Sequence, residues 1–393
     1  FKQKTAYEIG VRLVGSEMCI RDSPELLFGA LLATVVSLIP GVYLLIRGAE
    51  AGLGPVLAEI ATPRVAAMTG RTIGLVAVVW AATTVIGVTA AVLTTRTDVW
   101  GRRVLGVMLA LPLAVPSYVA AFTWASISDL WNPTGRFDGF WAAALVLTLY
   151  SYPYVYLPVA AALAGQDPAP AEVARALGHR EWSVLRRVTL PGVMPAIASG
   201  GLLVALYTLS DFGAVSILRV DTYTRAVFTT FSVGFDRVGA LALASLLLVL
   251  AVAIMLLEGA VRGAGRRYAR LGSSGSQTIA PVPLGWGKLV AFGGLVLLLA
   301  VSLGVPAWSL LRWTAAGVSR PGGLGELAAA VGGTLGAAGL GAVLTTLLAI
   351  PLGLYAARVP SRFSALLERV VFVSHALPGV LIGLSLVLSL IHI

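Results

Sequence analysis

The chain has 393 residues, of which 58% are hydrophobic and only 12% charged, and its mean hydropathy of +0.90 excludes an ordinary soluble globular domain. The formal charge is +10, but the cations lie in short loops between apolar runs, which is typical of membrane orientation and not of nucleic-acid binding. Apolar runs of about 20 residues recur, each long enough to cross the hydrocarbon core of a bilayer as a helix. The period-2 alternation of a transmembrane barrel is absent from the sequence. We therefore predict an all-α polytopic membrane protein in contact with the lipid bilayer.

The chain ends differ from the rest of the sequence. Residues 1–23 contain neither a sustained apolar period nor the apolar core of a signal peptide, although they hold Cys19, the single cysteine. They resemble translated sequencing-adaptor read-through, and so does the end from Leu388 to Ile393. We expect both segments to be non-native.

The apolar runs predict nine spans. Their approximate bounds are 26–46, 72–95, 104–127, 140–163, 197–217, 238–257, 288–311, 333–357 and 370 to the end. A Gly-, Ser- and Arg-rich linker, 258–287, separates the first six spans (24–257) from the last three (288–393).

The distribution of Arg and Lys predicts the orientation. The loops at 96–103, 164–198, 258–288 and 358–369 hold 15 of these residues, and the alternate loops hold 9. Because cytoplasmic loops carry the excess of cations, we assign the first set to the cytoplasm. The linker and the N-terminus are then cytoplasmic as well.

The sequence also repeats itself at a shift of 262 residues. The matches include Thr72 with Thr334, Gly74 with Gly336, Arg96 with Arg358 and Pro116 with Pro378. Two homologous halves in tandem are the simplest explanation. A second copy of the loop around residue 172 would fall beyond the end of the chain, so we expect the second half to be truncated.

The predicted cytoplasmic segment from Asp167 to Pro195 interrupts the apolar runs. Asp167 can cap a helix that begins at Pro168, runs through Glu172 to Leu177 and ends at Gly178. A second short helix, Arg180 to Val188, is expected to place Trp182, Leu185 and Val188 on one face and Arg186 and Arg187 on the other, and to end at Leu190 and Pro191. Together the two helices predict a knob that fits a groove on a soluble partner.

Part of this segment resembles a known family. Glu172-Val173-Ala174, three residues, Gly178, nine residues and Val188-Thr189-Leu190-Pro191 are similar to the EAA loop of binding-protein-dependent ABC importer permeases, E-A-A-x3-G-x9-I-x-L-P. Val173 and Val188 depart from the pattern, and both are apolar. The alternative is a basic loop that only orients the protein. The resemblance implies that these residues couple the chain to an ATPase: Glu172, Ala174, Gly178, Trp182, Leu185, Val188, Leu190 and Pro191.

The stretches LPLAVPSYVAAFTW from Leu111 and SDFGAVSILRVDTYTRAVF from Ser210 resemble the fused, two-half permeases of ferric iron importers. The resemblance implies two tandem type I ABC importer transmembrane domains in a bacterial inner membrane. It further implies cargo delivery by a periplasmic substrate-binding protein and ATP hydrolysis by a separate ABC ATPase dimer. That ATPase, and not this non-enzymatic chain, would bind ATP and Mg²⁺, in agreement with the lack of a G-x4-G-K-[ST] sequence. Ferric iron is the leading cargo, and thiamine, polyamines and phosphonates are the alternatives.

Asp211 is the single acid within a predicted span, where a charge is costly. One interpretation places it beside the translocation path near a cationic cargo. The alternatives are that the fifth span ends earlier than residue 217, or that Asp211 caps a broken helix through Phe212 and Gly213. No spacing in the sequence predicts a metal site or a catalytic residue. A secondary transporter, which also has internal repeats and acids within spans, is the competing class of protein.

Overall fold

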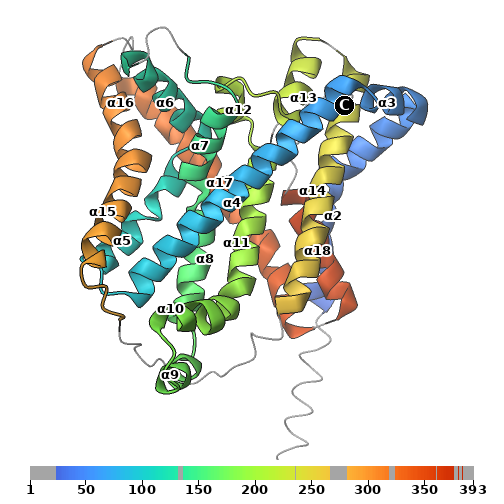
Figure 1. Ribbon diagram of the computed structural model, residues 1–393. Helices are drawn as coiled ribbons and strands as arrows, with labels where there is room; N and C mark the ends of the chain where they lie inside the picture. Colours follow the sequence, from blue (N-terminus) through green and yellow to red (C-terminus); the bar gives the residue numbers. More distant parts are fainter. Residues whose placement is uncertain are drawn as a thin grey trace, which may run out of the picture. The chain divides into compact units, whose positions relative to one another are not determined.

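The computed structural model describes residues 24–131, 136–234, 236–265, 281–317, 324–359 and 361–375, together with 379 and 383. Regular structure in these ranges is helical, apart from an isolated bridge between Thr97 and Val282 (Figure 1). Seven helical runs among the described residues are long and apolar enough to cross a membrane, or eight if one bent pair is a single span. The prediction of an all-α, multi-spanning protein is confirmed. The N-terminal segment and most of the ninth predicted span lie outside the described residues.

One compact unit runs from Arg47 to Val318, and its first complete helix is the short α3 (Leu53–Ile60). Its central helices are α4 (Pro63–Arg96), α8 (Pro153–Ala164), α11 (Leu190–Ser210) and α14 (Arg237–Gly265). The 34 residues of α4 reach about 51 Å at 1.5 Å per residue and pack along both α8 and α11 (Figure 1). Small residues bring the helices together: a Cβ on Gly87 would lie 3.0 Å from the backbone nitrogen of Tyr156, and one on Gly200 would lie 2.6 Å from the carbonyl oxygen of Tyr154.

The third and fourth predicted spans are interrupted. The third consists of α5 (Arg102–Met108), a 3-10 turn (Leu111–Ala114) and α6 (Ser117–Trp131), and the chain bends by 93° between the turn and α6. Pro112 lies in the 3-10 turn and Pro116 lies in the break directly before α6, and each lacks the N–H that a continuous helix would use. The fourth consists of α7 (Phe140–Ser151) and α8, which meet at Tyr152.

The fifth predicted span, 197–217, is wrong at both ends. The helical run begins at Glu181 and ends at Ser210. The chain then breaks at Asp211 and Phe212, forms the short helix α12 (Gly213–Ile217) and continues into α13 (Tyr223–Ser232). α14 begins one residue before the sixth predicted span and extends past it to Gly265.

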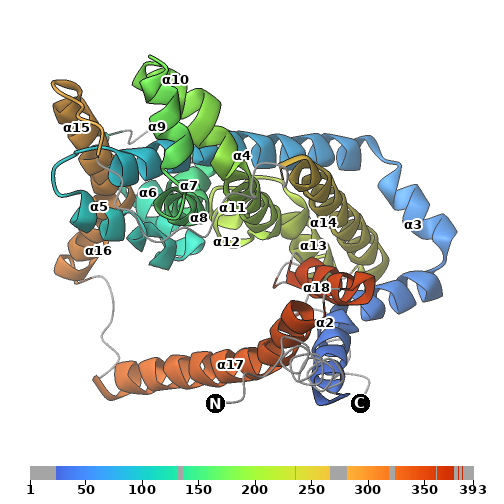
Figure 2. The same ribbon diagram turned by 90° about the horizontal axis from the view of Figure 1, so that it is seen from below.

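Helices after the linker join the same unit. α15 (Gly287–Leu299), a π-helical turn (Ala300–Gly304) and α16 (Val305–Ala315) make one apolar run, and α16 lies along α6 (Figures 1 and 2). The rings of Phe122 and Trp313 are 5.7 Å apart at this contact. The chain therefore returns, after the linker, to pack on helices of its first part.

The second compact unit combines the two ends of the described chain. It contains α2 (Pro24–Ala51) up to Ile46, α17 (Leu324–Arg358) and α18 (Arg362–His375). Ala30, Leu352 and Leu367 form its small apolar core, and a Cβ on Gly29 would lie 2.5 Å from Cβ of Pro351. Gly29 is thus required for the close approach of α2 to α17.

Candidate functional site

The first helix of the loop, α9 (Ala169–Ala176), has defined signals at both ends. Oδ1 of Asp167 accepts a hydrogen bond from the backbone N–H of Ala169 at 3.0 Å. The helix begins one residue later than predicted, so Pro168 and not Asp167 is its N-cap residue. At the other end Gly178 has a φ of +82°. The N–H of His179 donates to the carbonyl of Ala174, and the N–H of Gly178 donates to that of Arg175. This is a Schellman motif, and glycine is favoured there because it has no Cβ.

The second helix of the loop does not end where the sequence predicts. α10 (Glu181–Val184) passes through a π-helical turn, Leu185–Thr189, directly into α11. Leu190 and Pro191 therefore begin α11 and do not terminate a separate short helix. Pro191 is tolerated because it lies in the first turn of α11, next to a turn whose wider hydrogen-bonding pattern leaves room for the proline ring.

The two parts of the loop pack through a small apolar core. It consists of Ala171, Ala174 and Val184, with Val188 packed against it. The predicted face of Trp182, Leu185 and Val188 is wrong: the inward side chains are Val184 and Val188, four residues apart, and Trp182 is 67% exposed. The prediction assumed a regular α-helix, in which residues three apart share a face, whereas Leu185–Thr189 is a π-helical turn with a wider repeat.

The outer surface of the loop is apolar at its centre. Val173, Leu177 and Trp182 are 58%, 74% and 67% exposed, and we call these three side chains the knob face. A hollow of about 190 Å³ lies beside Val173 and Leu177, which line it together with Val188. Trp182 borders a separate cavity between the loop and α4. Glu172 is exposed next to this face. An exposed apolar cluster with polar neighbours is typical of a protein interaction site.

An ion pair braces the loop. Nε and Nη2 of Arg175 donate to the two carboxylate oxygens of Glu181 at 2.7 and 3.2 Å, which joins α9 to α10. Both side chains are partly exposed, so the pair contributes roughly 0.2–1 kcal/mol. It holds the relative position of the two helices more than it stabilises the protein.

Two polar residues at and after the end of α4 hold neighbouring segments: Arg96 holds the base of the loop, and Asp98 holds the start of the segment with α15. Arg96, the last residue of α4, donates hydrogen bonds to the carbonyl of Leu163 and to Oε1 of Gln166. Asp98 accepts hydrogen bonds from the N–H of Leu284 at 3.0 Å and from Nζ of Lys288 at 2.9 Å. The hydrogen bond from Lys288 is the main cause that lowers the pKa of Asp98, so this carboxylate is charged at neutral pH. Nothing in the sequence indicates these contacts, since they join segments far apart along the chain.

Asp211 lies at the break between α11 and α12 and is 7% exposed. Its Oδ1 accepts hydrogen bonds from the N–H groups of Ala214 at 2.9 Å and Val215 at 3.3 Å. Both alternatives to the translocation path agree with this geometry, because the span ends at Ser210 and Asp211 accepts hydrogen bonds from the first turn of α12. The 21 residues of α11 are about 31 Å long, so Asp211 is separated from Leu190 by about one hydrocarbon thickness. A role beside the translocation path stays a prediction.

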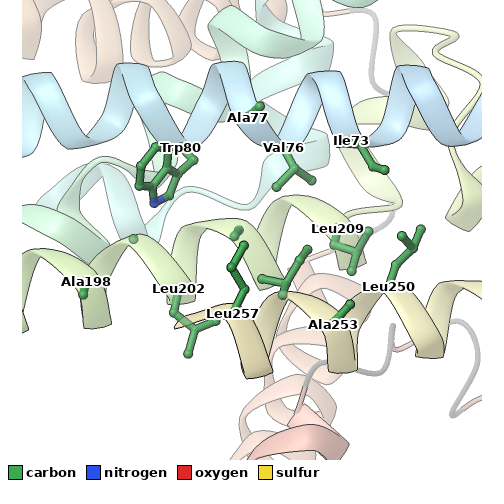
Figure 3. Close-up of a pocket in the computed structure, with 13 residues that line it drawn as sticks. Ile73, Val76, Ala77, Trp80, Ala198, Leu202, Leu209, Leu250, Ala253 and Leu257 are labelled. Carbon is green, nitrogen blue, oxygen red and sulfur yellow. The ribbon is translucent and has the colours of Figure 1, made fainter. Parts of the chain in front are cut away.

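The bundle contains an apolar groove of about 520 Å³ between α4, α11 and α14 (Figure 3). Its lining is Leu, Ile, Val, Ala and Gly, with Trp80 at one end. Such a lining offers no charged or oxygen ligand for a metal ion. Among the described residues, no group of three or more His, Cys, Asp or Glu side chains is arranged to hold a metal.

Comparisons with known proteins give consistent results. The sequence model of the family described as "Binding-protein-dependent transport system inner membrane component" matches residues 83–264, which include the whole loop. The Fe(3+)-transport system permease protein FbpB 2 of Haemophilus influenzae is 33% identical over 357 residues, covering 90% of this chain and 69% of the relative. The sulfate permease CysW of Escherichia coli K12 is 26% identical over 58% of this chain and 84% of its own length. The spermidine/putrescine permease PotC of Haemophilus influenzae is 30% identical over 44% of this chain and 68% of its own length.

Proposed function

The chain belongs to the family of binding-protein-dependent transport system inner membrane components, the permeases of ABC importers, and we propose that its cargo is ferric iron. It is a multi-pass inner-membrane transport subunit. The observation that carries the iron proposal is the similarity to an Fe(3+)-transport permease across 90% of this chain. The likeness to the sulfate and polyamine permeases covers less of the chain.

The loop is the proposed contact with a separate ABC ATPase dimer, which binds ATP and Mg²⁺. In this proposal the knob face, Val173, Leu177 and Trp182, enters a groove of the ATPase, with Glu172 at its edge. Ala174, Val184 and Val188 hold the shape of the knob from inside, and Gly178 sets the angle between its two helices. Leu185, Leu190 and Pro191 connect the knob to α11. The exposure of three large apolar side chains at one end of the bundle supports this assignment.

The orientation follows from the ATPase, which is a cytoplasmic partner in this proposal. α9 and α10 lie at one end of the bundle, and α12 and α13 lie at the other (Figure 1). The end with α9 then faces the cytoplasm, and the N-terminus is also cytoplasmic. The opposite end receives the periplasmic substrate-binding protein. The excess of Arg and Lys in the loops on the α9 side supports this arrangement.

A polyamine importer is the second candidate, because PotC is 30% identical where it aligns. Thiamine and phosphonate are more distant alternatives. The cargo is tested in proteoliposomes that contain the complete transporter, by measuring ATP-dependent uptake of ferric iron and of spermidine from the loaded binding protein. Uptake of spermidine without uptake of iron would overturn the iron proposal.

The ATPase contact is tested with Trp182→Ala. Large aromatic anchors at interfaces commonly contribute about 2 kcal/mol or more, so the ATPase should bind about 30-fold more weakly. The matched control is Trp286→Ala, since Trp286 is 94% exposed and lies outside the loop. Affinity is measured with detergent-solubilised permease and purified ATPase. Equal affinity of both variants for the ATPase would contradict the proposal that the loop contacts the ATPase.

A further inference from the structure

One guanidinium connects both ends of the loop to α4. Nη2 of Arg96 donates to the carbonyl of Leu163 at 2.9 Å and to Oε1 of Gln166 at 2.8 Å. Nε2 of Gln166 in turn donates to the carbonyl of Thr189 at 3.3 Å. Gln166 lies just before α9 and Thr189 just before α11. The entry and the exit of the loop are therefore held by a single hydrogen-bonded chain, Arg96 to Gln166 to Thr189.

The donor and acceptor groups in this chain of hydrogen bonds, and the space around them, fix its geometry. Leu163 lies in the last turn of α8, and its carbonyl accepts a hydrogen bond from the N–H of Gln166 at 3.3 Å as well as the one from Arg96. The Arg96 guanidinium is planar and rigid, so its two acceptors must stay in set positions. A Cβ on Gly192 would overlap Nε2 of Gln166, so the glycine after Pro191 provides the space in which the Gln166 amide lies.

Apolar packing between the loop and α4 is incomplete beside these hydrogen bonds. A cavity of about 400 Å³ separates them, lined by Val92 and Leu93 of α4, by Trp182 and Leu185 of the loop and by Leu284. Close-packed side chains transmit displacement, and a cavity interrupts that packing. The hydrogen bonds of Arg96 are consequently a principal direct link between the loop and the end of α4.

α4 can carry a displacement across the bundle. It is continuous from Pro63 to Arg96 and packs along α8 and α11. The segment after the linker also binds to the last residue of α4: the N–H of Val282 donates a hydrogen bond to the carbonyl of Arg96 at 2.8 Å. Movement at Arg96 is thus applied directly to the longest helix of this unit.

We propose that Arg96 and Gln166 are positioning residues that transmit movement of the loop to α4 and so set how much ATP is hydrolysed per cargo molecule imported. This proposal rests on the ATPase contact proposed above. It assigns to Arg96 and Gln166 a role that is separate from binding the ATPase, since neither side chain belongs to the knob face.

The test uses the complete transporter in proteoliposomes and measures three quantities: ATPase affinity, ATP hydrolysis and cargo uptake. Arg96→Ala and Gln166→Leu should retain the ATPase but raise the ATP hydrolysed per cargo at least about fivefold, the lower end of typical coupling between sites. Gln166→Glu keeps the acceptor for Arg96 and loses the donor to Thr189, so its ratio should be intermediate. Arg96→Lys should also be intermediate, because an ammonium lacks the planar geometry of the guanidinium.

The control is Arg103→Ala, which removes an exposed cation seven residues further along the chain and should keep the wild-type ratio. Equal ratios for Arg96→Ala and Arg103→Ala would overturn the proposal. So would a loss of ATPase affinity in Arg96→Ala with an unchanged ratio, since Arg96 would then only shape the docking surface. If Arg96→Ala does not fold, Arg96→Lys and Gln166→Glu decide the result. Failure of Trp182→Ala to weaken ATPase binding would instead refute the proposed contact itself.

Discussion

Gly178 determines the turn between α9 and α10 through its backbone and not through packing. Its φ is +82°, and a Cβ there would meet no atom within 4 Å. Gly178→Ala should therefore cost about 1–2 kcal/mol from backbone strain alone. Amide exchange at His179, whose N–H closes the turn, should become about 5- to 30-fold faster by mass spectrometry. Gly165→Ala is the control, since Gly165 has a φ of −90° and its Cβ would have an ordinary 3.6 Å contact; an equal change in both would refute the backbone explanation.

Asp211 provides a second prediction at the scale of one residue. Asp211→Ala removes the cap of α12 and should destabilise the protein by about 0.5–2 kcal/mol, whereas Asp211→Asn retains a carbonyl oxygen in the Oδ1 position. We expect Asp211→Asn to keep both the thermal midpoint and the uptake rate. A stable Asp211→Asn variant with reduced uptake would instead place the charge of Asp211 beside the translocation path.

Single-residue signals in the sequence were accurate where they are local. Asp167 and Gly178 act through backbone groups within a few residues, and their types indicate the start of α9 to within one residue and the turn after it. Arg96 and Gln166 were missed because their partners are 67 and 23 residues away along the chain, and nothing in residue type indicates such a contact.

At the scale of helices, composition located the apolar runs but not the places where they break. Leu190 and Pro191 predict the end of a short helix, yet the helix continues because a π-helical turn precedes Pro191. The third span, by contrast, does break at a proline, Pro116. The difference lies in the hydrogen bonds around each proline, which depend on tertiary packing.

Helix contacts in this bundle depend on glycines that differ in their surroundings. A Cβ on Gly87 would lie 2.9–3.1 Å from Cβ of Val155 and from backbone atoms of Tyr152 and Tyr156, while one on Gly74 would lie 3.9 Å from the Phe140 ring. Gly87→Ala should therefore force α4 away from α8 and cost about 1–3 kcal/mol. Gly74→Ala, on the same helix, should have little effect. Thermal unfolding in detergent measures both, and equal midpoints would contradict the close-contact argument.

At the scale of the whole molecule, the lengths and positions of two helical spans are consistent with the predicted repeat. The span Pro63–Arg96 and the span Gly325–Arg358 have the same length of 34 residues, and their bounds are related by the 262-residue shift. The tandem halves remain a prediction. The sequence could not indicate which helices group together, because surfaces that face lipid and surfaces that face other helices are both apolar.

The two compact units each take helices from both sides of the linker, and this leads to a prediction for the whole chain. Residues 24–265 supply α2 to one unit and α3–α14 to the other, while the residues from 281 onward supply α17 and α18 to the first and α15 and α16 to the second. Each unit would therefore lack part of its packing if either piece were missing. Two polypeptides divided within the linker should co-assemble when expressed together, with α16 on α6 and α2 on α17. Copurification from detergent through a tag on one piece measures this.

The contacts of Asp98 with Leu284 and Lys288 add to the association, so Asp98→Ala should lower the recovery of the second piece without abolishing it. Pieces that separate completely would show that the linker holds the helices together and that their packing does not.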